Sequence, residues 1–369
     1  MQRIALALIL FGLGITPARA DLTVKIGHAG PTTGPLAHIG KDGENGARLA
    51  IEDANTRGIV IGGQKIHFEL VGEDDQADPR VATTVAQRLT DGSIKGVVGH
   101  VTSGAAIPAS RIYEQAGVPV ITPSSTSPKL TAQGYKMVFR VIANDLQQGA
   151  AMAQLAGKQG AKRVAVIDDR TAYGQGLADA MADSLKKHGV AVVGREYTND
   201  KATDFLAILT KLKNVKPDAI FFGGMDSQAA PMLRQIRQLG LKVRFYGGDG
   251  VCTGEMLKLA AGAIDANTYC TQAGLAMEKM PGGLQFRERF KKRFGADVQL
   301  YAPYSYDAAM SLIEAMKAAG SVEPARYVQA LRTLSYKGVT GVIRFDAKGD
   351  IRDGGVTLYA WRDGKWVAQ

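Results

Sequence analysis

Short apolar runs alternate with amphipathic segments along almost the whole chain, and this alternation limits the possible folds more than any other feature. The first series of apolar runs lies at residues 24–29, 66–72, 97–100 and 118–122. The second series begins after about residue 143 and lies at 164–167, 190–196, 219–222 and 243–246. Repeated strand–helix units predict parallel sheets with helices on both faces. Two series of comparable length predict an α/β protein of two similar lobes.

Apolar residues at helical spacing predict helices between these runs, including helices at 173–188 and 202–212. Pro79 is expected to open another helix, because proline is well tolerated in a first helical turn. The end of the chain returns to a strand pattern at 342–345 and 357–361.

Residues 1–20 have the features of a secretory leader. Arg3 precedes an apolar run from 4 to 15, Pro17 breaks that run, and Ala18-Arg19-Ala20 has the small-x-small pattern that signal peptidase recognises. The run is short for a membrane span, which needs about 20 apolar residues. We expect cleavage before Asp21 and a soluble, exported mature protein.

The chain carries 45 Lys and Arg against 35 Asp and Glu, a formal charge of +10. These basic residues are scattered, and the densest run, 291–293, is flanked by Phe290 and Phe294 as on the solvated face of a helix. Without a motif or interleaved aromatic residues, this pattern does not indicate a nucleic-acid surface. We expect no nucleic-acid partner.

Cys252 and Cys270 both follow the leader. An oxidising compartment permits a disulfide between them, and two buried thiols are the alternative.

Motifs for catalysis and metal binding are absent from the sequence. Five residues separate Gly34 from Gly40 where a phosphate-binding loop has four, and Asp179 occupies the third small position of a dinucleotide fingerprint begun at Gly174. No serine-nucleophile elbow occurs, and the five histidines are dispersed. We expect no metal, no cofactor and no enzymatic activity.

Two polar, neutral segments follow neighbouring apolar strands, at residues 99–104 and 122–128. In open parallel sheets, ligands bind at the carboxyl ends of the strands, and hydroxyl groups with free amides at helix N-termini can hold an anion there. Alternatively, these Ser and Thr residues only cap helices and form turns.

The chain resembles the leucine/isoleucine/valine-binding proteins of ABC importers over essentially its whole mature length. The motifs that carry this resemblance are Thr33-Gly34-Pro35, Gly99-His100, Pro108-Ala109-Ser110, Ile121-Thr122-Pro123, Tyr173-Gly174-Gln175-Gly176, Gly248-Asp249-Gly250 and Gly338-Val339-Thr340-Gly341.

The resemblance implies a type I periplasmic-binding fold, with two doubly wound parallel-sheet lobes joined by a three-crossing hinge. The lobes would be 21–143 plus 274–354, and 144–273 plus 355–369. By analogy, Ser103, Ser124 and Thr126 would hold the carboxylate and part of the ammonium of an amino acid. Tyr173 would reach over from the second lobe, and Asp249 would pair with the ammonium.

The side-chain pocket departs from the family pattern at Ile39 and Met225, where many relatives have aromatic residues. Asp249 is also one methylene shorter than the glutamate of close relatives. Tyr301 is expected either at the apolar end of the pocket or as a core residue. The resemblance implies a monomeric receptor for an aliphatic amino acid that delivers it to an inner-membrane ABC permease. An aromatic amino acid, a short amide, a carboxylate, or a role as a ligand-sensing module are the alternatives.

Overall fold

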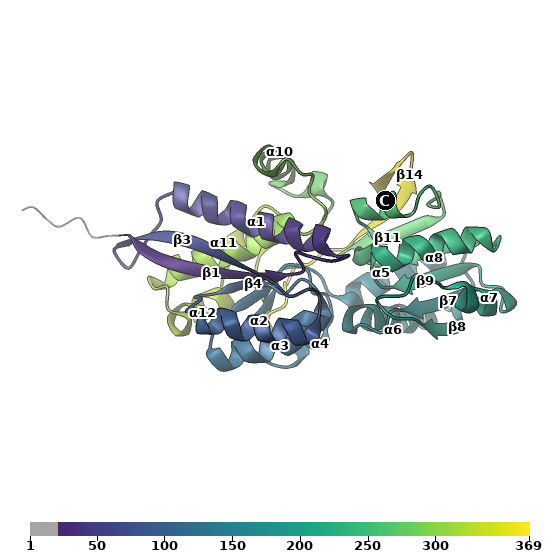
Figure 1. The fold of residues 1–369 in the computed structure, drawn as a ribbon, viewed down its shortest axis with the longest axis horizontal. Helices are drawn as coiled ribbons and strands as arrows, with labels where there is room; N and C mark the ends of the chain where they lie inside the picture. Colours follow the sequence, from purple (N-terminus) through teal and green to yellow (C-terminus); the bar gives the residue numbers. More distant parts are fainter. Residues whose placement is uncertain (1–20) are drawn as a thin grey trace, which may run out of the picture.

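The computed structural model describes residues 21–369, and the predicted leader, 1–20, lies outside this range. Its strands form two main sheets, each with its own helices, which lie end to end along the long axis (Figure 1). The first sheet has the order β2-β3-β1-β4-β5-β6, with strands β1 (Leu22–Gly30), β2 (Val60–Ile61), β3 (Gln64–Asp74), β4 (Val97–Gly99), β5 (Val120–Thr122) and β6 (Val138–Arg140). The second has the order β15-β14-β11-β10-β9-β7-β8, with strands β7 (Arg163–Asp168), β8 (Ala191–Tyr197), β9 (Ala219–Gly223), β10 (Arg244–Gly247), β11 (Thr268–Gln272), β14 (Thr357–Arg362) and β15 (Lys365–Ala368).

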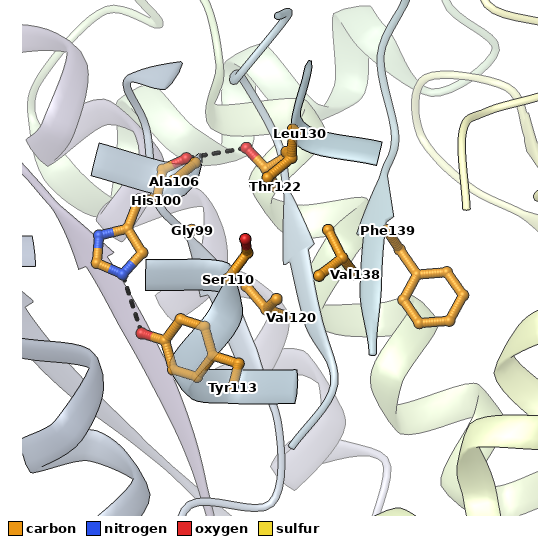
Figure 2. Close-up of a pocket in the computed structure, with 10 residues that line it drawn as sticks. All are labelled: Gly99, His100, Ala106, Ser110, Tyr113, Val120, Thr122, Leu130, Val138 and Phe139. Carbon is orange, nitrogen blue, oxygen red and sulfur yellow. Dashed lines mark hydrogen bonds between the residues drawn. The ribbon is translucent and has the colours of Figure 1, made fainter. Parts of the chain in front are cut away.

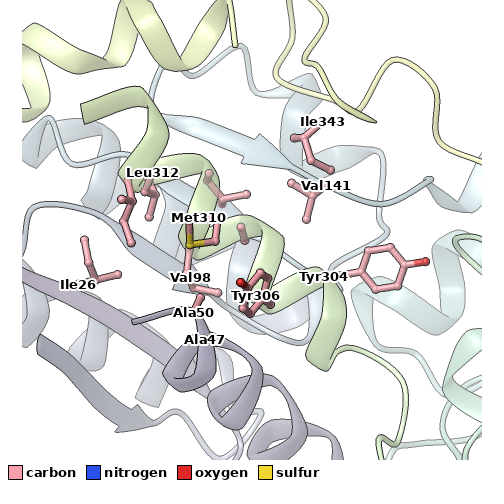
Figure 3. Close-up of a cluster of buried hydrophobic side chains, with 14 of the residues drawn as sticks. Ile26, Ala47, Ala50, Val98, Val141, Tyr304, Tyr306, Met310, Leu312 and Ile343 are labelled. Atoms are coloured by element: carbon pink, nitrogen blue, oxygen red, sulfur yellow. The ribbon is translucent and has the colours of Figure 1, made fainter. Parts of the chain in front are cut away.

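Helices cover both faces of the first sheet. They are α1 (Ala37–Thr56), α2 (Pro79–Asp91), α3 (Ser103–Ala116), α4 (Lys129–Ala132), α10 (Gly283–Phe294), α11 (Ala302–Ala319) and α12 (Pro324–Arg332). Consecutive strand residues point to opposite faces. Val97 therefore packs with α2 and α3, whereas Val98 packs with α1 and α11. Figure 3 shows the second of these cores, where Met310 and Leu312 of α11 lie close to β1 and β4. We call this sheet with its helices the first lobe.

Helices also cover both faces of the second sheet. They are α5 (Asp145–Lys158), α6 (Ala172–Lys187), α7 (Leu206–Asn214), α8 (Asp226–Gln238) and α9 (Gly254–Leu259). Val164 and Val166 of β7 pack with α5 and α6, and Ala165 and Ile167 pack with α7 and α8. We call this sheet with its helices the second lobe.

The chain crosses between the lobes three times, before α5, after β11 and before β14. The short elements are the 3-10 turns η1 (Asp249–Val251) and η2 (Met277–Lys279) and the hairpin of β12 (Tyr336–Lys337) and β13 (Val342–Ile343). Two lobes of mainly parallel strands with a three-crossing hinge confirm the predicted fold class.

Three local predictions differ from the structure. β2, β14 and β15 pair antiparallel with their neighbours at the sheet edges, so neither sheet is purely parallel. The helix predicted at 202–212 begins only at Leu206. The side-chain amide of Gln235, in α8, donates to Thr203 O and accepts from Phe205 N, and these two hydrogen bonds hold the segment before Leu206 out of the helix. The strand predicted at 342–345 is only the two-residue β13, after which Phe345 forms an isolated bridge with Ile351.

Candidate functional site

Every residue that the sequence singled out for ligand binding lies at the end of a strand or the beginning of a helix near the cleft. Ser103 begins α3, and Ser124 and Thr126 lie in the loop after β5. From the second lobe, Tyr173 lies in the first turn of α6, Met225 precedes α8, and Asp249 begins the η1 turn after β10. Ile39 of α1 and Tyr301, which precedes α11, come from the first lobe.

A cavity between the lobes brings most of these residues together. Its lining residues are Ile39, Val101, Thr102, Ser103, Ser124, Tyr173, Met225, Asp249 and Tyr301. The space between the lining atoms, including the part open to solvent, is about 220 Å³. Thr126 is buried but is not among the lining residues.

Asp249 is the centre of the polar network in the cavity. The Tyr173 hydroxyl donates to its Oδ1 at 2.7 Å and the Gln148 amide donates to the same oxygen at 3.0 Å. The Tyr301 hydroxyl donates to Oδ2 at 2.8 Å. Because Tyr301 belongs to the first lobe, this last hydrogen bond spans the cleft. Tyr301 is thus buried and lines the cavity, but its hydroxyl makes that wall polar.

Two buried carboxyl groups lie near each other in this network. Burial raises the pKa of Asp249 above its usual value, and hydrogen bonds from Gln148, Tyr173 and Tyr301 oppose that rise. Burial, with the negative charge of Asp249 as a further cause, raises the pKa of Asp145 to about 8. None of the cavity-lining residues is cationic. A bound cationic group would stabilise these carboxyl groups in their ionised form.

The opposite side of the cavity offers hydrogen-bond donors. Ser103 Oγ accepts from Ser125 Oγ at 3.1 Å and from the Ser127 amide at 3.2 Å, which leaves its own proton available to a ligand. The Thr102 hydroxyl is buried without a hydrogen-bond partner among the described residues. The helix α3 begins at Ser103, so its first backbone N–H groups have no acceptor within the helix. These free N–H groups favour the binding of an anion. The Ser124 hydroxyl instead donates to Val101 O at 2.9 Å.

Arg140 fixes the loop that carries Ser124 and Thr126. Its guanidinium is buried and donates to the carbonyl oxygens of Ser125 at 3.2 Å and Ser127 at 2.8 Å. Its other terminal nitrogen pairs with Asp350, which bridges to Arg140 at the edge of the first sheet. The loop is therefore held by contacts within the first lobe.

Sequence reasoning did not identify three residues of this site, Arg140, Asp145 and Gln148, and it included Thr102 only as part of the polar segment 99–104. Gln148 had a detectable signal, because it lies four residues before Met152 on the buried face of α5, where a polar side chain needs a partner. Its amide oxygen accepts from Thr271 Oγ1 at 2.6 Å. Nothing local distinguished Asp145 from an ordinary first-turn acid.

The structure confirms the disulfide between Cys252 and Cys270, with Cα atoms 5.5 Å apart. Cys252 directly follows η1, and Cys270 lies in β11, next to Gly247 of β10 in the sheet. The bond therefore fastens the turn that carries Asp249 to the second sheet.

A second cavity lies inside the first lobe, between α3 and the sheet, away from the cleft (Figure 2). His100 Nε2 is 3.0 Å from the Tyr113 hydroxyl, and its Nδ1 is 2.7 Å from Asp75 Oδ2. The Thr122 hydroxyl donates to His100 O at 2.9 Å. Since these polar groups are paired with one another and the remaining lining is mostly apolar, this cavity has the character of core packing.

Residues 21–369 contain no group of three or more His, Cys, Asp or Glu arranged to hold a metal ion. Within the same residues, no helix combines the length and the apolar character needed to span a membrane.

Known proteins resemble this chain over most of its length. The profile of a family described as periplasmic binding protein matches residues 23–365. An amino acid binding protein of Pseudomonas aeruginosa is 38% identical over 350 residues, 94% of this chain and 92% of that protein. A leucine-, isoleucine-, valine-, threonine- and alanine-binding protein of the same organism is 34% identical over 362 residues, 98% of this chain and 95% of that protein.

Solved structures of similar proteins have the same fold. A leucine binding protein from Thermotoga maritima superposes with a TM-score of 0.86 at 30% identity, covering 94% of this chain and 97% of that one. A branched-chain amino acid transporter substrate binding protein from Streptococcus pneumoniae, in complex with isoleucine, superposes with a TM-score of 0.81 at 28% identity, covering 94% and 100%.

Proposed function

The chain belongs to the periplasmic binding protein family, and from that premise we propose that it is a receptor for a branched-chain aliphatic amino acid. It binds the amino acid between its lobes, catalyses no reaction, and delivers the ligand to an ABC-type permease of the inner membrane. Relatives named for leucine, isoleucine and valine binding support this ligand class.

The observation that carries the proposal is the opposed chemistry of the two sides of the cavity. An amino acid is a zwitterion, so its site needs donors for the carboxylate and an acid for the ammonium. Ser103 and the N-terminus of α3 supply the donors, and Asp249 supplies the acid. Both interactions become strong once closure excludes water.

The remaining lining supports an aliphatic side chain. Ile39, Val101 and Met225 are apolar and lie in the same cavity. Met225 adapts its shape readily because its side chain is unbranched. We place Ser124 and Thr126 in the carboxylate-binding loop. Ser124 lines the cavity, and Thr126 lies in the same loop without lining it.

We assign residues 21–143 plus 274–354 to the first lobe and 144–273 plus 355–369 to the second. The packing of α10, α11 and α12 with the first sheet and of β14 and β15 with the second supports this division. We further propose a periplasmic monomer from which residues 1–20 have been removed. The intact mass of the exported protein tests the cleavage, because it should correspond to a chain that begins at Asp21.

Titration calorimetry of L-leucine into residues 21–369 tests the function, after unfolding and refolding to remove any bound ligand. We expect one-to-one binding with a micromolar or lower dissociation constant. A flat trace from folded protein contradicts the aliphatic ligand, and L-phenylalanine and acetamide then test the aromatic and amide alternatives.

The variant Asp249→Ala tests the site. We expect its dissociation constant for L-leucine to rise at least tenfold, because an ammonium would remain buried without its partner. Asp183→Ala, at an exposed position of the same lobe, is the control and should bind as the wild type does. Equal affinity of Asp249→Ala and the control would remove Asp249 from the ammonium site.

A further inference from the structure

A second polar contact spans the cleft beside the candidate site. His38, in the first turn of α1, places its Nε2 2.8 Å from Oδ2 of Asp226, the first residue of α8. The two residues come from different lobes and are 188 positions apart. Their sequence neighbours Ile39 and Met225 both line the cavity. This pair can form only when the two lobes come together.

A positively charged partner would stabilise Asp226, whose side chain is buried when the cleft is closed. Its side chain is 1% exposed, and its Oδ1 has no hydrogen-bond partner among residues 21–369. The Thr253 hydroxyl donates to Oδ2, the oxygen that His38 also contacts. A buried carboxylate with one oxygen unpartnered is costly unless a cation lies close to it.

The groups around His38 favour its protonated form. Burial by itself lowers the pKa of His38, but the hydrogen bond to Asp226 and the negative charges of Asp226 and Glu255 outweigh burial and raise that pKa above 6.5. On its own helix, Lys41 is exposed, and Asp42 accepts from the backbone N–H groups of 299–302. The acids that act on the imidazole thus come from α8 and α9 of the other lobe.

We propose that His38 and Asp226 form a proton-dependent latch that holds the lobes closed, so that the receptor retains its ligand more tightly in mildly acid than in alkaline solution. His38 is a positioning residue, because it acts on closure without lining the cavity. This proposal rests on the proposed function in one respect: the choice of L-leucine as the ligand with which retention is measured.

The direction of the pH dependence follows from linkage. In the open protein, a solvated imidazole has its ordinary pKa of about 6.5. In the closed protein the pKa is higher. The latch therefore contributes fully below about pH 6.5, and its contribution is lost as pH rises through the closed-state pKa. Affinity should fall over that interval.

Calorimetry with L-leucine at pH 6 and pH 9 measures the effect. We expect the dissociation constant to rise between pH 6 and pH 9 in the wild type, and to rise less in His38→Gln. The two rises should differ by on the order of fivefold, which corresponds to the energy of a partly exposed ion pair. Glutamine can still donate to Asp226 but does not titrate, so any slope left in this variant belongs to other groups such as Asp145. Asp226→Asn should have the same reduced slope. His67→Gln, at an exposed position of β3, should have the wild-type slope.

Small-angle scattering of the ligand-free protein tests the latch without any assumption about the ligand. The radius of gyration of the wild type should be smaller at pH 6 than at pH 9, and that of His38→Gln should not change. Equal pH dependence of wild type and His38→Gln in both measurements overturns the latch. Absence of leucine binding at either pH, with the scattering difference intact, overturns the proposed ligand and leaves the latch supported.

Discussion

Asp249 shows how a single side chain can depend on several distant parts of the chain. Its carboxyl group is bound by donors from α5, from α6 and from the residue before α11. The strand before it, at residues 243–246, was predicted from the local pattern, whereas its place in the ligand site was implied by the resemblance. Its partner Gln148 was not identified, because 101 residues separate the two and only the packing of α5 brings them together.

His28 is another residue whose environment determines its behaviour. It lies in β1 with its side chain fully buried, and neither ring nitrogen has a hydrogen-bond partner among the described residues. Complete burial, only partly offset by nearby acids, lowers the pKa of His28 to about 4. The folded protein therefore holds this imidazole neutral where an unfolded chain would protonate it.

We expect His28 to make the fold sensitive to acid. Because its folded pKa lies below the unfolded value of 6.5, the unfolded chain binds the proton first, and stability falls as pH drops from about 6.5 to about 4. At 1.36 kcal/mol per pKa unit, the loss is about 3 kcal/mol. Urea denaturation at pH 7, 5.5 and 4.5 measures it.

The variant His28→Gln should show a shallower fall in unfolding free energy over this range, whatever its stability at pH 7. His188→Gln removes an exposed imidazole and is the matched control. A variant whose unfolding free energy falls as steeply as that of the wild type would exclude His28 as the source.

At the scale of elements, the η1 turn has little regular structure of its own and depends on covalent support. It spans only Asp249–Val251 and is fastened to β11 by the Cys252–Cys270 disulfide. The bond closes a loop with a sequence separation of 18 residues. Loops of this size are expected to contribute about 3 kcal/mol of stability when cross-linked.

We expect the double variant Cys252→Ser/Cys270→Ser to lose about that amount of unfolding free energy in the second lobe. The chain has two tryptophans, and both lie in the second sheet: Trp361 in β14, the neighbour of β11, and Trp366 in β15, the edge strand beyond it. Tryptophan fluorescence during urea denaturation therefore reports on this lobe. Wild type treated with a reductant should behave as the variant does, and an unchanged midpoint in both would show that the bond adds no stability.

At the scale of the whole molecule, the two lobes have separate cores and meet through the hinge and the cleft. Within the described residues, the side-chain hydrogen bonds His38–Asp226 and Tyr301–Asp249 join the two sides of the cleft. A ligand that touches both lobes adds contacts that exist only in the closed form and shifts the population toward it.

We expect L-leucine to stabilise both lobes against unfolding. At one hundred times its dissociation constant, a ligand adds about 2.7 kcal/mol. The thermal transition seen by tryptophan fluorescence, which reports on the second lobe, should rise together with the transition of the whole chain seen by circular dichroism. If only the transition temperature seen by circular dichroism rises, the ligand stabilises the first lobe alone, which would contradict binding between the lobes.

The sequence by itself determined the parts of this protein that depend on local pattern. Alternating apolar runs and helical spacing predicted most strands and helices, and the polar segments at strand ends predicted where the cleft would lie. The elements and the polar strand ends follow from periodicity and from the rule that ligands bind at the carboxyl ends of parallel strands. The eight residues expected at the ligand came instead from the resemblance to leucine/isoleucine/valine-binding proteins, and seven of them line one cavity in the structure.

Only the tertiary structure decided how side chains from distant segments pair. Gln235 delays the start of α7, Tyr301 turns its hydroxyl to Asp249, and His38 meets Asp226 across the cleft. Periodicity tells which face of an element a residue occupies, but not which side chain of another element lies opposite. That choice depends on how the packed layers and the hinge place the elements, and so these contacts, the latch among them, required the folded molecule.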